Sequence, residues 1–219
     1  MIDLHFHSTF SDGSFSPEEL VELGASAGLT AMVLTDHDST RGVSAFLAAA
    51  AAKGIRAMSG LELSVDVPNI TVHILAYGCD PDNGPLNEAL VQIRDGRYRR
   101  NVEILSKLSK LGCYLTWGEV SAYAGDKEVV ARPHFAQALI DKGFARSKQD
   151  AFDRFLAKGA AAYVDRFRLG PEMALKLIRD AGGVAVLAHP ALCGLDSAKL
   201  RDFIGKLTAW GLSGIEAYY

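Results

Sequence analysis

The sequence predicts an α/β fold in which parallel strands form a barrel, and two observations support this prediction. Short apolar runs typical of strands alternate with segments of helical periodicity over residues 2–77 and again over residues 171–218. The run at 31–35 is almost continuously apolar, which is expected for a strand buried on both of its faces. A chain of 219 residues with 49% hydrophobic residues is long enough for one such domain with an insertion.

The first half of the pattern begins with a strand and then a helix whose start carries clear capping signals. Ser16 stands at the N-cap position, Pro17 at the first helical position, and Glu19 closes a capping box. That helix is expected to end near Ala27, just before Gly28. A second helix is predicted at 42–53, and strands are predicted at 2–7, 31–35, 55–64 and 70–77.

The second half returns to this alternation after a long helical stretch. Helices are predicted at 171–181 and 197–210, and strands at 184–188 and 214–218. The intervening stretch has helical periodicity without strand signals, at 86–111, 117–124, 132–142 and 147–157. We therefore expect a barrel formed by residues 1–79 and 164–219, interrupted by a helical insertion at 80–163. Such insertions belong to loops, and the loops at the C-terminal ends of barrel strands build active sites.

Histidines and carboxylates cluster at or just beyond the ends of the predicted strands. His5 and His7 are two residues apart, so both side chains point to the same face of a strand. His73 lies early in its strand, and an antiparallel step there would bring it back to the cluster. A single histidine more often satisfies a core hydrogen bond, but the whole set favours a metal site. The candidate metal ligands are His5, His7, Asp12, His37, Glu62, His73 and His189.

These residues belong to short motifs that follow one another in a definite order. The motifs are Asp3-Leu4-His5-Phe6-His7, Ser11-Asp12-Gly13, Thr35-Asp36-His37-Asp38, Gly60-Leu61-Glu62, His73-Ile74-Leu75, Arg132-Pro133-His134 and Leu187-Ala188-His189-Pro190. In this order they resemble the motifs of the PHP (polymerase and histidinol phosphatase) metallophosphoesterases, over essentially the whole chain. The resemblance is strongest to the branch that acts on nucleotides and short RNA. It implies a distorted TIM-like barrel of the (β/α)7 type with a helical lid.

The resemblance also implies two to three divalent metal ions. Manganese, iron and zinc all suit a mixed set of histidine and carboxylate ligands. The implied ligands are His5, His7 and Glu62 for the first ion, Glu62 as a bridge with His73 and His189 for the second, and Asp12 and His37 for the third. Asp3, Asp36 and Asp38 flank the histidines, where they would either fix the orientation of imidazole rings or form turns.

Arg132 and His134 lie in the helical insertion, just before an apolar helix. An arginine, a histidine and a helix N-terminus together make a favourable phosphate site. By the resemblance, Arg132 and His134 contact the substrate phosphate. Arg132 would then stabilise the charge of the transition state, and His134, or a water on the third metal, would protonate the leaving group. The alternative is a surface arginine beside a histidine that caps its helix.

Together these features predict a metal-dependent phosphoesterase, a hydrolase that cleaves phosphate monoesters or diesters of nucleotides. The resemblance implies a 3′,5′-bisphosphonucleotide phosphatase or a 5′–3′ exonuclease of short oligoribonucleotides. One alternative is a histidinol-phosphate-type phosphatase, and another is a non-catalytic metal-binding module. The helical insertion with Arg132 and His134 fits the nucleotide branch better than the histidinol-phosphate branch.

Composition and the chain ends limit the partners and the compartment. The net charge of −3 argues against the broad basic surface that duplex DNA binding requires. No apolar run approaches a membrane span, and the three cysteines are too far apart for a disulfide framework. Because the first strand follows directly on Met1, no signal peptide is expected and a cytoplasmic protein is predicted. In the family an Asp-x-His pair follows on the last strand, so we expect this chain, ending at Tyr219, to lack that strand.

Overall fold

The computed structural model describes residues 1–124 and 129–217, and the chain folds as two compact units. The first unit consists of residues 1–91 together with the chain from 168 onward, and the second of residues 92–167. The last residue of the strand predicted at 214–218 lies outside the described residues.

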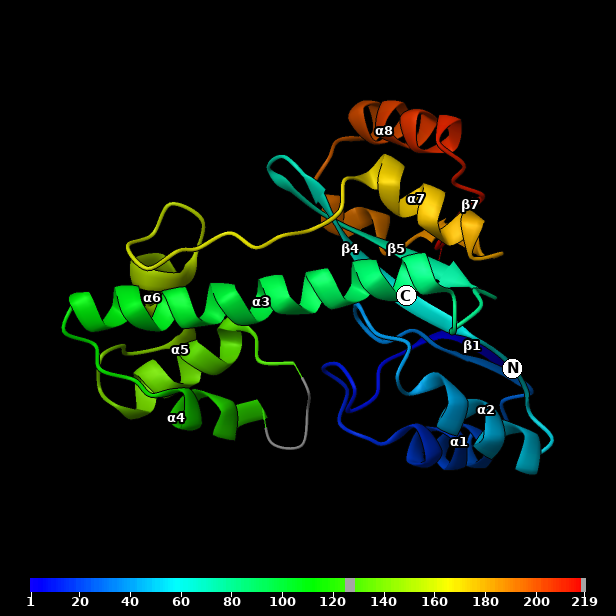
Figure 1. Ribbon diagram of the computed structural model, residues 1–219, viewed down its shortest axis with the longest axis horizontal. Coiled ribbons are helices and arrows are strands. Elements are labelled where there is room, and N and C mark those ends of the chain that lie inside the picture. Colours follow the sequence, from blue (N-terminus) through cyan, green and yellow to red (C-terminus); the bar gives the residue numbers. More distant parts are fainter. Residues whose placement is uncertain (125–128, 218–219) are drawn as a thin grey trace. The chain divides into compact units, whose positions relative to one another are not determined.

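The strands of the first unit form two sheets (Figure 1). A three-stranded parallel sheet has the order β1-β2-β3, and a four-stranded mixed sheet has the order β4-β5-β6-β7. The strands are β1 (Ile2–Phe6), β2 (Ala31–Leu34), β3 (Arg56–Met58), β4 (Gly60–Val67), β5 (Ile70–Tyr77), β6 (Val184–Leu187) and β7 (Gly214–Ile215).

The strand predicted at 55–64 is two strands, because β3 ends and β4 enters the other sheet at Gly60. A Cβ atom at Gly60 would lie 2.7 Å from the Leu34 carbonyl oxygen, so only glycine lets the chain pass this close to β2. β4 and β5 form an antiparallel hairpin in which Val67 pairs with Ile70. β5 also runs antiparallel to β6, so the antiparallel step expected at His73 is confirmed. Because β6 and β7 are parallel, this sheet is mixed and departs from the predicted parallel arrangement at β5.

Backbone pairing continues from the end of β2 into β4. The Glu62 N–H donates to the Asp36 carbonyl at 3.1 Å, and the Asp38 N–H donates to the Glu62 carbonyl at 3.0 Å. The segment that follows β2 in the first sheet is therefore joined to β4 of the second sheet at Glu62. Among residues 1–124 and 129–217 the ladders give two sheets and no closed ring of strands, so the fold is a mixed α/β arrangement.

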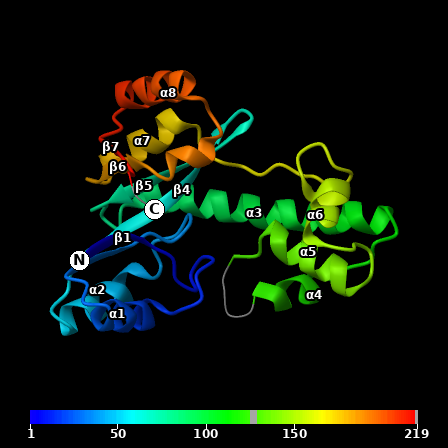
Figure 2. The same cartoon turned by 180° about the vertical axis from the view of Figure 1, so that it is seen from behind.

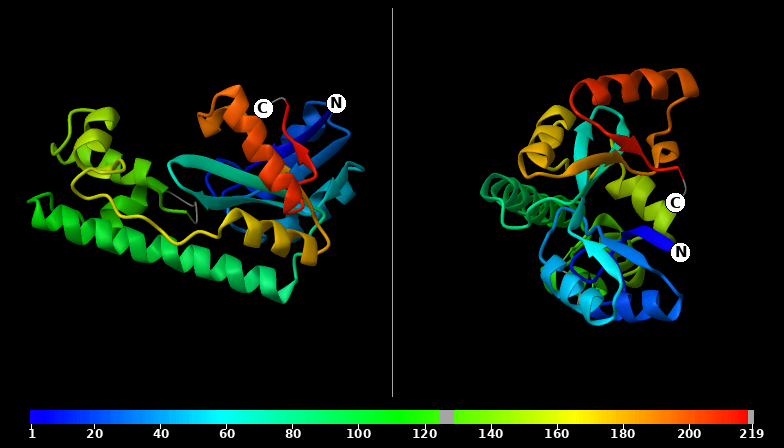
Figure 3. Two further views of the ribbon diagram at one scale, coloured as in Figure 1. Left: turned by 90° about the horizontal axis from the view of Figure 1, so that it is seen from above. Right: turned by 90° about the vertical axis from the view of Figure 1, so that its right-hand side faces the viewer.

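Helices α1 (Pro17–Ser26) and α2 (Val43–Ala52) pack side by side along one face of the parallel sheet (Figures 1 and 2). They bury a core of Leu20, Val21, Met32, Leu34, Phe46, Ala50 and Ile55. The remaining helices of this unit, α7 (Pro171–Asp180), the 3-10 turn η3 (Pro190–Cys193) and α8 (Ser197–Ala209), follow one another in the chain around β6 and β7 (Figure 3).

The second unit is helical, as the periodicity predicts. The helix α3 (Gly84–Lys110) begins in the first unit and continues into the second, which also contains α4 (Trp117–Ser121), η1 (Ala122–Ala124), α5 (Arg132–Asp141), α6 (Lys148–Ala151) and the π-helix η2 (Phe152–Leu156). Its own core includes Ile104, Leu108, Phe135, Leu139 and Leu156. In the described part of the chain, every helix is too short or too polar to cross a membrane.

The capping box at the start of α1 is present and generates a prediction. The Glu19 N–H donates to Ser16 Oγ at 3.2 Å, and the Ser16 N–H donates to Glu19 Oε2 at 2.8 Å. Because Ser16→Ala leaves one amide of the first turn without this partner, we expect the free energy of unfolding to fall by about 1 kcal/mol. Urea denaturation followed by circular dichroism measures this loss. Ser26→Ala is the control, since its hydroxyl bonds only to the Glu22 carbonyl within α1, and an equal loss in both variants would contradict the prediction.

Candidate metal centre

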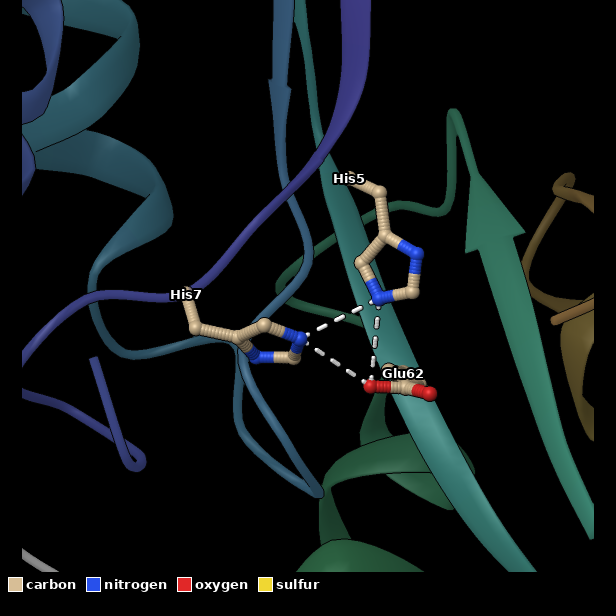
Figure 4. Close-up of side chains that lie close together, drawn as sticks. All are labelled: His5, His7 and Glu62. Atoms are coloured by element: carbon tan, nitrogen blue, oxygen red, sulfur yellow. Dashed lines mark hydrogen bonds and ion pairs between the residues drawn. The ribbon is translucent and has the colours of Figure 1, made fainter. Parts of the chain in front are cut away.

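The carboxylate of Glu62, on β4, lies at the centre of the histidine cluster, and only 1% of its side chain is exposed. Five histidines place a ring nitrogen within 3.3 Å of one of its two oxygens, and Figure 4 shows His5 and His7 converging on one of them. The distances are 3.3 Å for His5 Nε2, 3.2 Å for His7 Nε2 and 3.1 Å for His37 Nδ1 to Oε2, and 2.9 Å for His73 Nδ1 and 2.8 Å for His189 Nε2 to Oε1.

Strand register explains how residues far apart in the sequence meet here. In the β4–β5 ladder Glu62 pairs with Leu75 and Ser64 pairs with His73. Glu62 and Ser64 point to the same face of β4, so His73 is the diagonal neighbour of Glu62 on that face. The backbone of His37 forms a bridge to Glu62, and His189 lies two residues after the end of β6. The residues predicted from strand ends therefore do converge.

Asp12 extends the cluster on its exposed side. Its carboxylate lies 3.6 Å from His7 Nδ1 and 3.8 Å from His37 Nε2, and 54% of its side chain is exposed. Gly13 makes this placement possible, because a Cβ atom there would lie 1.9 Å from the His7 carbonyl oxygen. The loop can fold back onto β1 only with glycine at that position.

The flanking aspartates order the surrounding loops. Asp36 accepts hydrogen bonds from the Ser8 N–H at 2.7 Å and from the hydroxyls of Ser8 and Ser11 at 2.6 Å each. Asp38 accepts from the Ser64 N–H at 3.0 Å, and Asp3 accepts from the His5 N–H at 3.2 Å. In these contacts the three carboxylates bond to backbone and serine groups, which is the turn chemistry weighed as the alternative.

The geometry of the donor atoms fits divalent cations. Three groups each bring their ligand atoms within 4.8 Å of one another, and they are His5 with His7 and Glu62, His7 with Asp12 and His37, and His37 with Glu62 and His73. Ring nitrogens also face one another, at 3.1 Å between His5 Nε2 and His7 Nε2 and at 3.3 Å between His73 Nδ1 and His189 Nε2. Two lone pairs directed at one point suit a shared cation, because imidazole and carboxylate groups are its usual ligands.

The electrostatics of the cluster are dominated by burial and by the charge of Glu62. Burial opposes ionisation of Glu62, but hydrogen bonds from the surrounding histidines outweigh it and hold the pKa of this carboxyl far below its usual range. Burial also opposes charge on His5, yet its hydrogen bonds to Glu62 and Glu216 raise the pKa of His5 to about 9. Burial lowers the pKa of His37 to about 4 despite the attraction of Glu62. Without a metal the cluster therefore contains both charged and neutral imidazoles.

Glu216 is a member of the site that the sequence analysis missed. Its Oε1 lies 2.9 Å from His5 Nδ1, and its Oε2 accepts the His189 N–H at 2.7 Å. Glu216 directly follows β7. Its place at the end of an apolar run, which Glu62 and His189 share, was the sequence signal that could have identified it.

Arg132 and His134 lie in the second unit, at the start of α5, as predicted. His134 accepts the Ala131 N–H through Nδ1 at 3.1 Å, so it does cap its helix. The Arg132 guanidinium donates to the Leu156 carbonyl at 3.2 Å and stacks over the Tyr163 ring at 5.5 Å from its centroid. Both side chains are thus fixed in orientation within this unit.

Comparison with known proteins places this chain in a family. Residues 3–168 match the family model of the PHP domain. The chain belongs to the PHP-domain family. It is 35% identical to a 3′,5′-nucleoside bisphosphate phosphatase from Chromobacterium violaceum over 98% of this chain and 75% of the relative. It is 33% identical to a 5′–3′ exoribonuclease from Haemophilus influenzae over 98% of this chain and 77% of the relative.

Two solved structures have the same fold. A structure described as an amidohydrolase from Chromobacterium violaceum with bound sulfate and no metal matches with a TM-score of 0.85 at 35% identity, over 98% of this chain and 75% of that chain. A putative metal-dependent phosphoesterase from Bifidobacterium adolescentis matches with a TM-score of 0.81 at 30% identity, over 98% and 76%. The chain is therefore a PHP-domain hydrolase of the phosphoesterase class.

The raised pKa of His5 generates a prediction about metal binding and pH. Below a pKa of about 9 the metal-free His5 carries a proton, which a cation must displace from Nε2. The apparent affinity for Mn²⁺ should therefore rise between about pH 6 and pH 8.5, by up to about tenfold per pH unit for one displaced proton. Calorimetric titration in two buffers of different ionisation enthalpy measures the proton release. A pH-independent affinity without proton release would contradict the prediction.

Proposed function

We propose that this PHP domain hydrolyses phosphate monoesters or diesters of nucleotides, as a 3′,5′-bisphosphonucleotide phosphatase or as a 5′–3′ exonuclease of short oligoribonucleotides. The observation that carries this proposal is the convergence of five histidines on the buried carboxylate of Glu62. The relatives named for these two activities are 31–35% identical to this chain over most of its length. The helical insertion with Arg132 and His134 favours these activities over a histidinol-phosphate-type activity, and the enzymatic relatives argue against a non-catalytic module.

We propose that two to three divalent ions, manganese, iron or zinc, bind at this cluster. Glu62 offers one oxygen to His5, His7 and His37 and the other to His73 and His189, which suits a bridge between two ions. Asp12 and His37 offer donors for a third ion, in a group with His7 that shares both histidines with the other two groups. When bound, such ions supply positive charge to the phosphate and lower the pKa of a water molecule.

We propose that Arg132 binds a substrate phosphate and that His134 donates a proton to the leaving oxygen. The His134 Nδ1 atom accepts the Ala131 N–H, so the neutral ring carries its own proton on Nε2. A proton at a defined atom is what a general acid requires. The fork of the Arg132 guanidinium suits phosphate oxygens, and its stacking on Tyr163 limits its rotamers.

We propose that the strands belong to a distorted TIM-like barrel of the (β/α)7 type, with residues 80–163 as a helical insertion. We place the protein in the cytoplasm, with small phosphorylated molecules, nucleotides and short oligoribonucleotides as its substrates. The net charge of −3 supports a substrate preference that excludes duplex DNA.

The function is tested by a substrate screen with a metal-site variant as the control. The manganese-loaded protein should release phosphate from a 3′,5′-bisphosphonucleotide or mononucleotides from a 5′-phosphorylated oligoribonucleotide, and should leave histidinol phosphate intact. Glu62→Ala should abolish this turnover and reduce bound metal by more than one ion, because both carboxylate oxygens are lost. Elemental analysis and circular dichroism complete the measurement. Turnover by Glu62→Ala at the wild-type rate, or none by the wild type on any nucleotide, would contradict the proposal.

Suitable variants can test the proposed chemical roles of Arg132 and His134 without removing the helix cap that His134 forms. Arg132→Ala should leave the metal content unchanged. It should weaken the binding of phosphorylated substrates by about 1.5–3 kcal/mol, the range for a hydrogen bond to a charged group. His134→Asn keeps an acceptor for the Ala131 N–H but removes the proton on Nε2, so it should lower kcat more than it raises KM.

Arg146→Ala is the matched control for these variants, because Arg146 is an exposed arginine of the same unit. It should change neither kcat nor KM. A loss of metal from His134→Asn, or wild-type kinetics in both site variants, would show that these two residues have another role.

A further inference from the structure

Glu216 connects two of the candidate metal ligands that come from different sheets. Its Oε1 lies 2.9 Å from Nδ1 of His5 on β1, and its Oε2 accepts the backbone N–H of His189, which follows β6, at 2.7 Å. Only 11% of its side chain is exposed. Both oxygens of one partly buried carboxylate are therefore engaged by residues of the histidine cluster.

The backbone around Glu216 fixes where this carboxylate lies. β7 pairs with β6 in parallel register, with Leu187 opposite Ile215, and the Glu216 N–H donates to the Leu187 carbonyl at 2.9 Å. The ladder thus extends by one residue beyond β7 and orients the side chain toward β1. No rearrangement of the chain is needed to make the contact.

The contact with His5 determines which ring nitrogen faces the cluster. Nε2 of His5 lies 3.1 Å from His7 Nε2 and 3.3 Å from Glu62 Oε2, while Nδ1 faces Glu216. A carboxylate accepts hydrogen bonds and does not donate them, so it selects a proton on Nδ1. In the neutral ring the lone pair is then on Nε2, directed at the metal cluster.

The contact with His189 holds a strained part of the backbone. His189 has φ 28° and ψ 63°, in the left-handed region, and it directly precedes Pro190. A non-glycine residue keeps such a conformation only when its surroundings hold it there. The hydrogen bond from the His189 N–H to Glu216 does so, and it leaves Nε2 of the ring 2.8 Å from Glu62 Oε1.

We propose that Glu216 is a positioning residue of the metal centre, which orients His5 through its Nδ1 proton and His189 through its backbone. This inference rests on the proposed metal-dependent function. Carboxylates that accept the second N–H of a ligand histidine typically contribute 10- to about 100-fold to metal affinity. Glu216 does this for one ligand and fixes the main chain of another, so a single side chain supports ligands from both sheets.

Metal affinity tests the proposal directly. Titration of metal-stripped protein with Mn²⁺ should give an affinity about 10- to 100-fold weaker for Glu216→Ala than for the wild type, with the same number of ions bound at saturation. Glu216→Gln keeps the shape but cannot accept at both positions, because its amide NH₂ faces one of the two donors, and its affinity should lie between the two. Glu172→Ala is the control, since Glu172 is an exposed glutamate of the same unit, and it should bind as the wild type does.

Nuclear magnetic resonance of the zinc-loaded protein measures the exchange of the His5 Nδ1 proton with water, which a general loss of stability would not change selectively. The His5 Nδ1 proton should exchange slowly with water in the wild type and in Glu172→Ala, and should be lost to exchange in Glu216→Ala. If Glu216→Ala fails to fold, Glu216→Gln gives both measurements.

Three outcomes separate this inference from the function on which it rests. Equal Mn²⁺ affinity in the wild type and both Glu216 variants would overturn the positioning role. A variant that binds one ion fewer, with unchanged affinity for the others, would overturn it as well, because Glu216 would then be a ligand. A wild-type protein that binds no Mn²⁺ or Zn²⁺ would instead overturn the proposed metal-dependent function.

Discussion

The buried charge of Glu62 is the constraint on which the rest of the first unit depends. An ionised carboxylate in a protein interior is costly unless it is paired and hydrogen-bonded. Here five imidazoles surround it, and its backbone makes the two hydrogen bonds that join the segment after β2 to β4. The strand ends, the β4–β5 register and the turn after β6 all bring a histidine to this one group. The apolar packing of α1 and α2 fixes the parallel sheet from which His5 and His7 project.

Much of this arrangement is predictable from the sequence because the relevant signals are local. The spacing of His5 and His7, the apolar run before His37 and the capping box at Ser16 each depend on a few neighbouring residues. The switch between sheets at Gly60 was missed although Ser59-Gly60 interrupts the predicted strand, because the switch depends on how closely β2 passes, which the local sequence does not show. Glu216 was missed for a related reason, since one carboxylate after a two-residue strand has no periodic pattern.

The second unit shows that a capping role and a chemical role do not exclude each other. The Ala131 N–H that His134 satisfies also determines the tautomer of its ring. Sequence periodicity predicted the helices correctly, but not the π-helix of η2 within the segment at 147–157, because the hydrogen-bond shift that creates it has no distinct periodicity in a short window. A role of His134 as a helix cap and a role as a general acid are therefore compatible, because the capping hydrogen bond uses Nδ1 and leaves the proton on Nε2.

The close approach of Gly13 to the His7 carbonyl has a consequence for how this protein can vary. A side chain at that position would have to displace the backbone of His7, whose ring lies 3.2 Å from Glu62 in the histidine cluster. The loop between His7 and Ser16 can therefore not be shortened, lengthened or diversified at Gly13 without moving Asp12. Adaptation of the centre to a different ion must come from the exchange of ligand side chains on an unchanged backbone. In libraries of variants of this enzyme, Gly13 should therefore be kept fixed.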